Sequence, residues 1–322
     1  MLINIELFRE PIYDCLQILV ASLAIHNNRC YEMISLGRLG FKYTKNDKNR
    51  IGDKLYMYGK LKYYDMLSDY HGIEAYMYTL KNKELIEWVI NKINNNTPLI
   101  IESDTFWCPW SSAFQKKHVE HYFLFIGYDL EKRIFICLDP LITQNYVEIR
   151  FDDMKNIIKN IIELNYEKEQ DNSLKLYTAL ANDMDHYLDQ KNMFSLYNIF
   201  VFLDDLKNKL NISTEISGYE DNINSMPIIE NLWLCCTNRY SYGRLIEYIC
   251  KVKKNDELLP FSNAINNSAN EWAKIRNQFI KLFTYYYKTN LLNENLLTKI
   301  FTNINECAIN EIEFALKLRN AM

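Results

Sequence analysis

The hydrophobic pattern near the start of the chain predicts a helix. Between Tyr13 and Asn28, apolar side chains recur from Leu16 to Leu23 at the i, i+3, i+4 and i+7 spacing of one helical face. Asp14 is a favourable N-cap residue and stands directly before this run. We therefore expect an amphipathic helix whose first turn follows Asp14.

The pattern then alternates between extended and helical segments. Ile73–Tyr78 is typical of an extended piece, and Asn82–Asn94 has the apolar face of an amphipathic helix. Pro98–Ser103 is a short apolar run, which favours a buried strand. Asp104–Gln115 follows as a loop that carries two tryptophans, a proline and a cysteine. This alternation indicates an α+β region.

Two further strands form a predicted β-hairpin. His121–Tyr128 and Arg133–Pro140 are rich in strand-forming residues, and a polar turn separates them. If the turn is centred near residue 130, His121 and Asp139 lie at equal distances from it on opposite strands. Their Cβ atoms would then be roughly 5 Å apart. This spacing would let a carboxylate orient an imidazole ring.

Helical periodicity dominates the chain after about Asp152. A polar and charged stretch at Glu163–Ser173 indicates a linker. We expect an α+β domain with a central antiparallel sheet over residues 1–165, and an all-helical domain over 174–322 that covers the functional site. The expected helices of this half are Met154–Leu164, Leu174–Tyr187, Met193–Leu210, Ile228–Val252, Ala264–Tyr287 and Leu292–Leu318.

Composition narrows the classes of partner. The 322-residue chain is 48 % hydrophobic with a net charge of −4 and no basic run, so nucleic acid is not an expected partner. No apolar stretch approaches the about 20 residues of a membrane span. The eight cysteines form no CxxC pair and no cluster with zinc-ligand spacing. We expect reduced thiols, a cytoplasmic location and no metal.

Three residues supply the roles of nucleophilic catalysis. Cys15 falls in the first turn of the first helix, where backbone N–H groups and the helix dipole stabilise a thiolate. His121 could take the thiol proton and Asp139 could orient the imidazole. The alternative is that Cys15 is a small core residue. A further alternative is that Cys108 is the nucleophile, although its loop offers no helix dipole.

Several motifs extend this arrangement. Gly37 and Gly40 lie three apart without a preceding strand, so we do not interpret them as a phosphate-binding loop but as a loop or short ribbon beside a cleft. The motifs are Cys15-Leu16, Leu36-Gly37-Arg38-Leu39-Gly40-Phe41-Lys42-Tyr43, Asp104 through Pro109-Trp110, His121, Gly127-Tyr128-Asp129 and Asp139-Pro140. Over roughly residues 10–150 they resemble the N-terminal domain family of the butirosin biosynthesis H protein, and the order Cys-His-Asp resembles C39 peptidases of papain fold. The resemblance extends to amide-forming synthetases of polythioamide biosynthesis.

This resemblance implies acyl transfer. An acyl group would pass from the phosphopantetheine thioester of an acyl or peptidyl carrier protein to Cys15, and then to a small amine or diamine. No cofactor is implied beyond the carrier's own phosphopantetheine. Asp104, Trp107 and Trp110 are expected to bind substrate, with the aromatic rings excluding water from the acyl-enzyme.

Two alternative functions remain, and the sequence departs from the papain-like pattern at one point. A cysteine peptidase or amidase would use the same triad with water as acceptor, and an inactive binding protein could keep the fold. Papain-like enzymes usually supply an oxyanion-hole Gln upstream of the cysteine, but no Gln precedes Cys15. The backbone N–H of Cys15, with Asn4 or a second backbone N–H, is left for that role.

Overall fold

The contacts of the computed structural model divide the chain into two compact units. It describes residues 1–10, 12–57, 63–79, 82–143, 145–167 and 173–322. The sheet unit comprises Met1–Ile34 and Tyr63–Gln170, and the helical unit comprises Ser35–Lys62 and Asp171–Met322. The chain therefore passes from one unit to the other more than once.

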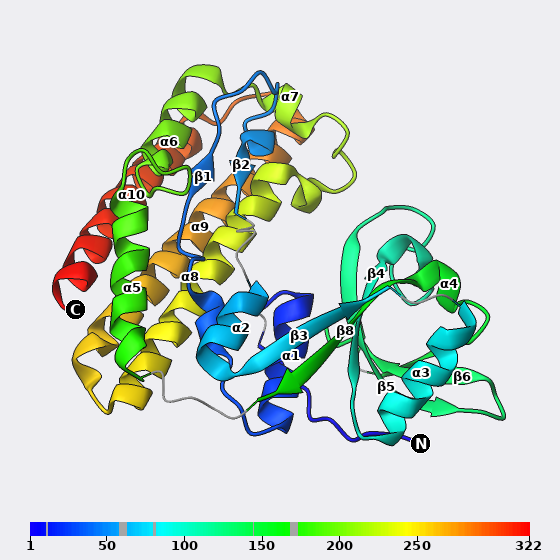
Figure 1. Cartoon of the computed structure of the whole chain (residues 1–322). Coiled ribbons are helices and arrows are strands. Elements are labelled where there is room, and N and C mark those ends of the chain that lie inside the picture. The colour runs from blue at the N-terminus through cyan, green and yellow to red at the C-terminus, as the bar shows by residue number, and fades with distance from the viewer. Residues whose placement is uncertain (11, 58–62, 80–81, 144, 168–172) are drawn as a thin grey trace. The chain divides into compact units, whose positions relative to one another are not determined.

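A six-stranded sheet organises the sheet unit (Figure 1). Every pair of neighbouring strands is antiparallel, in the order β3-β8-β4-β5-β6-β7. This confirms the predicted α+β class with a central antiparallel sheet. The strands are β3 (Ile73–Tyr78), β4 (Leu99–Asp104), β5 (Glu120–Asp129), β6 (Ile134–Leu138), β7 (Tyr146–Arg150) and β8 (Ile158–Tyr166).

Helices pack against this sheet and close its core. Contacts join α1 (Cys15–His26) to β5, and α3 (Asn82–Asn94) to β4 and β5. Apolar residues such as Leu19 of α1 and Phe123 of β5 are fully buried in one cluster. The buried apolar surface provides most of the stabilisation, about 25 cal/mol per Å². The remaining helices are α2 (Tyr63–His71) and the short α4 (Met154–Ile157).

One predicted helix is wrong. Helical structure covers only Met154–Ile157, and the strand β8 begins at Ile158. The apolar run that includes Ile161 and Ile162 lies between β3 and β4, where both residues are almost fully buried. An inner strand with a long apolar run satisfies the helical period as well as the strand period, so periodicity alone did not separate the two.

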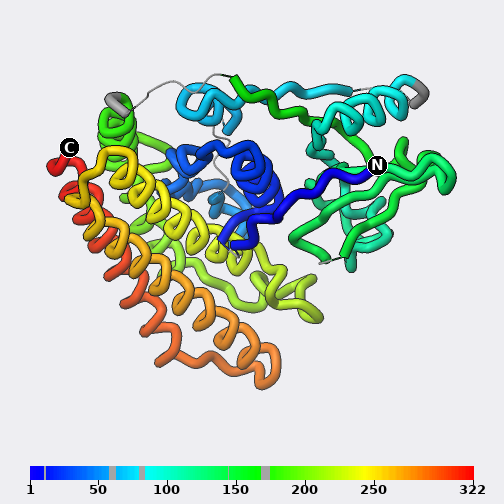
Figure 2. Tube along the Cα trace, turned by 90° about the horizontal axis from the view of Figure 1, so that it is seen from below, coloured from blue at the N-terminus to red at the C-terminus, as the bar shows by residue number. Residues whose placement is uncertain are grey.

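Long helices form most of the helical unit. Figure 2 shows α8, α9 and α10 running side by side. The expected helices after residue 173 are confirmed, except that the one expected from Met193 begins only at Asn198. The described residues from Ser173 onward contain no strand. No described helix combines the length and apolarity needed to cross a membrane. The helices are α5 (Ser173–Leu188), α6 (Asn198–Lys209), α7 (Ile212–Ile216), α8 (Pro227–Lys253), α9 (Leu259–Thr289) and α10 (Glu294–Asn320).

The described residues 35–57 pack with these helices although they precede most of the sheet unit in sequence. They contain a two-stranded ribbon in which β1 (Lys42–Tyr43) pairs with β2 (Leu55–Tyr56). A division at a single point near residue 165 therefore separates this segment from its packing partners. The expectation that the helical region covers the catalytic site stays a prediction.

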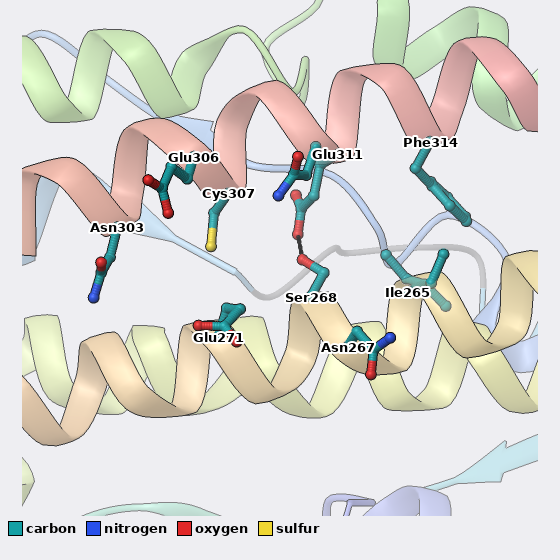
Figure 3. A pocket seen from close by; sticks show the side chains of 11 residues that line it. Ile265, Asn267, Ser268, Glu271, Asn303, Glu306, Cys307, Glu311 and Phe314 are labelled. Carbon is teal, nitrogen blue, oxygen red and sulfur yellow. Dashed lines mark hydrogen bonds between the residues drawn. The ribbon is translucent and has the colours of Figure 1, made fainter.

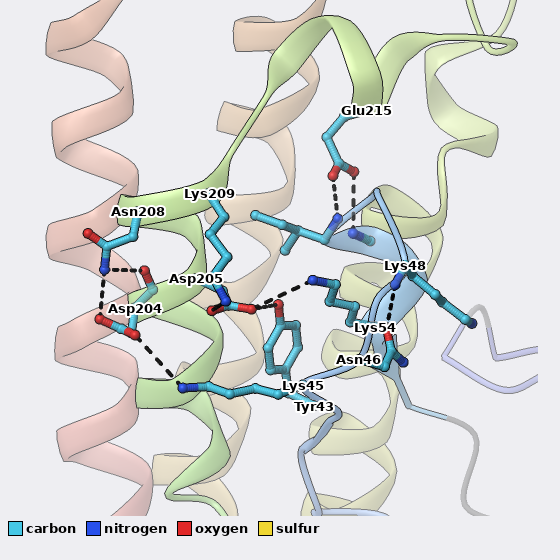
Figure 4. A network of polar contacts seen from close by, with 12 residues as sticks. Tyr43, Lys45, Asn46, Lys48, Lys54, Asp204, Asp205, Asn208, Lys209 and Glu215 are labelled. Carbon is cyan, nitrogen blue, oxygen red and sulfur yellow. Dashed lines mark hydrogen bonds and ion pairs between the residues drawn. The ribbon is translucent and has the colours of Figure 1, made fainter.

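A polar network fixes the ribbon to the helices (Figure 4). The hydroxyl of Tyr43 donates to Asp205 Oδ2 at 2.8 Å, and the ammonium groups of Lys54 and Lys209 lie 3.9 and 2.9 Å from the same carboxylate. The buried carboxylate of Glu215 accepts from the backbone N–H groups of residues 51 and 52. Both buried carboxylates thus receive hydrogen-bond or charged partners from the segment that carries the ribbon.

Candidate active site

Helix α1 presents Cys15 as its first residue. Asp14 is the N-cap, and its Oδ1 accepts from the backbone N–H of Gln17 at 2.8 Å. Gln17 Oε1 in turn accepts from the backbone N–H of Asp14 at 3.0 Å. This reciprocal pair is a capping box, which fixes where the helix begins. The predicted helix and its cap are confirmed.

The charge state of Cys15 differs from the expectation. Protein surrounds the sulfur, although part of the residue's surface remains exposed. This burial, together with the adjacent Asp14 carboxylate, raises the pKa of the Cys15 thiol to about 12. Hydrogen bonds from the backbone N–H groups of Tyr122 and Leu16 act in the opposite direction but are weaker. Burial and the Asp14 charge therefore outweigh the expected stabilisation of a thiolate by the helix N-terminus, and a base must take the proton of the thiol.

His121 and Asp139 form a buried hydrogen-bonded pair. His121 Nε2 lies 2.7 Å from Asp139 Oδ2, and the two residues are 3 % and 1 % exposed. A carboxylate only accepts hydrogen bonds, so Nε2 carries the proton when the ring is neutral. The Nδ1 nitrogen then remains as the basic atom. Within the described part of the chain, no hydrogen bond engages Nδ1.

The strands reach this contact in a different register from the predicted one. Leu124 pairs with Leu138. A bulge between Phe125 and Gly127 changes the pairing by one residue along the hairpin. His121 is therefore diagonal to Asp139, not directly opposite. Diagonal side chains lie about 7–8 Å apart at Cβ and are still within reach of a ring. The predicted contact is confirmed, but the predicted register is wrong, because the turn displaces the pairing by three residues and the bulge reverses only one of them.

Cys15 lies near the same end of β5, since the Tyr122 backbone and the Asp139 charge both influence the pKa of its thiol. The backbone N–H of Tyr122, the neighbour of His121, donates to the Cys15 sulfur. The charge of Asp139 also acts on the thiol and raises its pKa slightly further. The three predicted catalytic residues are thus grouped within the sheet unit. A contact of about 4 Å between the sulfur and the imidazole stays a prediction.

Trp110 joins this group through Asp139. Its indole Nε1 donates to Asp139 Oδ2 at 2.7 Å, the same oxygen that His121 contacts. The backbone N–H of Ile142 donates to the other oxygen, Oδ1, at 3.2 Å. Sequence reasoning placed Trp110 beside the site but missed this hydrogen bond, since no local pattern joins the loop to the end of β6.

The other two predicted substrate-binding residues lie within their own loop. Asp104 Oδ2 is 2.7 Å from His118 Nδ1, and Oδ1 accepts from the backbone N–H of Phe106 at 2.9 Å. Trp107 is 40 % exposed and packs edge-on against Phe106. Among the described residues, no hydrogen bond joins Asp104 or Trp107 to the triad. Their role in substrate binding stays a prediction.

Cys108 has the surroundings of a core residue. It is fully buried, its sulfur lies 3.7 Å from Ser103 Oγ, and it donates to the carbonyl oxygen of Asp104 at 3.5 Å. Burial raises the pKa of the Cys108 thiol to about 11. Cys108 has no exposed surface and its thiol donates within its own loop, whereas Cys15 keeps part of its surface exposed to a substrate. This argues against the alternative nucleophile.

The sequence leaves the oxyanion role to the backbone N–H of Cys15, with Asn4 or a second backbone N–H. Asn4 is exposed, and Gln17 Oε1 is engaged in the capping box. The Gln17 Nε2 amide is buried without a partner among the described atoms. The first-turn N–H of Cys15 therefore remains the leading donor, since the first N–H groups of a helix have no intrahelical acceptor. No group of three or more potential metal ligands occurs among the described residues.

A separate hollow of about 610 Å³ lies between α9 and α10 (Figure 3). Glutamates and amides line it, among them the fully buried Glu311. Both oxygens of Glu311 accept from Arg239 at 2.8 Å, and Trp272 Nε1 donates to it at 2.8 Å. Because this carboxylate is already neutralised, we interpret it as part of helix packing.

A known protein family matches a segment that contains most of the sheet unit. Residues 23–172 match the Peptidase_C39 like family. This segment includes His121 and Asp139 and begins after Cys15. No curated protein sequence matches the chain. The similarity supports a papain-type cysteine enzyme, in agreement with the antiparallel sheet and the grouped Cys, His and Asp.

Proposed function

We propose that the protein is an acyltransferase that forms amides through a Cys15 thioester. The observation that carries this proposal is the buried His121–Asp139 pair at the end of β5 where Cys15 contacts Tyr122. The motif resemblance to carrier-dependent acyltransferases favours a thioester donor over a peptide. The donor would be an acyl group on the phosphopantetheine of a carrier protein.

The chemistry follows from the protonation states. His121 takes the thiol proton as the Cys15 sulfur attacks the thioester carbonyl, because the free thiol is protonated. Collapse of the tetrahedral intermediate breaks the bond to the pantetheine sulfur, which leaves with the proton from His121. A neutral amine then attacks the acyl-enzyme and gives its proton to His121. The departing Cys15 sulfur regains that proton, and the free enzyme is restored.

Intact-protein mass spectrometry tests the nucleophile. The wild type mixed with an acyl-pantetheine thioester should retain one acyl mass, and Cys15→Ala should retain none. Cys30→Ala is a matched control because Cys30 is also partly exposed. It should be acylated like the wild type. An acyl mass that persists in Cys15→Ala would contradict the proposed nucleophile.

Product analysis separates amide synthesis from hydrolysis. The family match also favours a second candidate, a cysteine peptidase or amidase with the same triad. A synthase should convert acyl-thioester and millimolar amine mainly to amide, whereas a hydrolase should give mainly free acid or cleave peptides. His121→Ala should lose either activity by at least about a hundredfold, the usual size of a general-base effect.

A further inference from the structure

A second hydrogen-bond donor shares the carboxylate oxygen that orients His121. Asp139 Oδ2 accepts from His121 Nε2 and from Trp110 Nε1, each at 2.7 Å. These distances are at the short end for N–H···O contacts, as expected when the acceptor is charged. With Ile142 N–H on Oδ1, at least three donors hold one buried carboxylate. Asp139 is thus fixed in one orientation by neighbours other than His121.

Packing aims the indole N–H at this oxygen. The Trp110 ring is partly buried and stands edge-on to Phe123, with the ring planes at 90° and the centroids 5.4 Å apart. Phe123 is fully buried and follows His121 by two residues, so both side chains leave the same face of β5. The strand that carries the base therefore also supports the tryptophan.

We propose that Trp110 is a positioning residue for the catalytic base. Its N–H fixes the Asp139 carboxylate so that the His121 ring keeps Nδ1 directed towards Cys15. The N–H also shares the charge on Oδ2, which limits how strongly Asp139 stabilises a protonated imidazole. The inference rests on the proposed triad. It differs from the sequence-based expectation, in which Trp110 contacts the substrate and excludes water.

Two replacements at position 110 separate the N–H from the ring. Trp110→Phe keeps an aromatic ring beside Phe123 and removes the donor. Incorporation of 3-benzothienylalanine at position 110 keeps the full bicyclic shape and also lacks the N–H. Trp88→Phe is the matched control, because Trp88 is also a partly buried tryptophan of the sheet unit but packs against Tyr78, away from the triad.

The first readout is thioester consumption, whichever product forms. Both position-110 variants should lower kcat by about tenfold to a hundredfold, the scale of a misplaced catalytic group. KM should change less than about twofold, since no substrate contact is lost. The acid limb of the kcat/KM profile should move to higher pH, because Oδ2 then stabilises protonated His121 more strongly. Trp88→Phe should leave all three quantities unchanged.

The rate at which iodoacetamide alkylates Cys15 at pH 7 tests the triad and the role of Trp110 separately. His121→Ala should slow alkylation strongly, and both position-110 variants should slow it severalfold. If His121→Ala has no effect, the triad and the proposed function fail together. If only the position-110 variants have no effect, the positioning role alone is overturned. An increase in KM with unchanged kcat and pH profile would overturn it in favour of a substrate-contacting ring.

Discussion

At the scale of single residues, Asp14 has two opposing effects. Its carboxylate caps α1 through the backbone N–H of Gln17, which stabilises the helix by about 1 kcal/mol. The same charge raises the pKa of the neighbouring Cys15 thiol, second only to burial. Helix stability and thiol reactivity are therefore coupled at this position. Replacing the charge while keeping the cap separates the two effects.

Asp14→Asn should make Cys15 more reactive without loosening α1. Asn is as good an N-cap as Asp, and its side-chain oxygen can accept from Gln17 N–H. Without the carboxylate charge, the pKa of the Cys15 thiol should fall below its value of about 12. Below the pKa, each unit of decrease gives about ten times more thiolate. The pH dependence of iodoacetamide alkylation, followed by intact mass, measures this change.

The control for this experiment is Glu6→Gln. Glu6 is exposed and is not among the groups that act on the Cys15 thiol. This variant should alkylate at the wild-type rate at every pH. Circular dichroism should give Asp14→Asn a melting temperature close to that of the wild type. Equal alkylation of Asp14→Asn and wild type would show that burial alone sets the state of the thiol.

The sequence predicted which residues form the site, but not the raised pKa of the Cys15 thiol or the hydrogen bond that holds Asp139. Residue types and strand order were enough to group Cys15, His121 and Asp139. The raised pKa of the thiol depends on protein around the sulfur, and the Trp110–Asp139 hydrogen bond joins residues 29 positions apart. Neither the raised pKa nor this hydrogen bond follows from a local sequence pattern, so neither could be predicted without the fold.

At the scale of elements, flanking residues and hydrophobic periodicity determined which predicted helices and strands were correct. The helix after Asp14 was found because a cap and an apolar stripe agree. Strand β8 was missed because its apolar run is buried between β3 and β4, and burial on both faces removes the alternation that identifies a strand. The hairpin was found, but the turn displaced its register, and the bulge after Phe125 reversed only part of that displacement.

The ribbon β1–β2 should depend on one buried carboxylate. Asp205 is fully buried and is contacted by Tyr43, Lys54 and Lys209. Asp205→Ala leaves the nearly buried ammonium of Lys54, 8 % exposed, without this partner. Removal of one member of a buried ion pair costs about 3–5 kcal/mol. We expect a decrease of that order in the free energy of unfolding, measured by urea denaturation.

The neighbouring residue provides the control. Asp204 is 60 % exposed in its side chain and lies 4.0 Å from Lys45. Exposed ion pairs contribute about 0–1 kcal/mol, so Asp204→Ala should change the free energy of unfolding by no more than that. Similar losses in the two variants would mean that burial of Asp205 does not determine the stability of the ribbon.

At the scale of the whole molecule, the Leu36–Tyr43 motif belongs to the helical unit. Gly37 has a positive φ of 80°, and its N–H donates to Asp183 Oδ2 at 3.0 Å. A Cβ at Gly40 would lie 2.9 Å from atoms of Phe194 and Tyr187, so only glycine fits there without a shift. The motif was recognisable in the sequence, but its partners lie about 150 residues away along the chain.

This packing predicts how the chain can be divided. A fragment of residues 1–165 contains Leu39, Phe41 and Tyr43 but lacks the helices that bury them. In the full chain, Phe41 packs against Phe202 and Trp272 with centroids 5.7 and 5.5 Å apart. The fragment should therefore expose an apolar surface, bind the dye ANS and associate during size-exclusion chromatography.

A second fragment tests the cause. Residues 1–170 with positions 36–61 replaced by a Gly/Ser linker keep the six-stranded sheet and its core, and lack the apolar ribbon. Since a flexible linker carries no apolar face, this fragment should elute as a monomer and bind little ANS. The full chain is the reference for both measurements. If the 1–165 fragment is also monomeric and binds no dye, residues 35–62 do not need the helices for burial, and the division into these two units is incorrect.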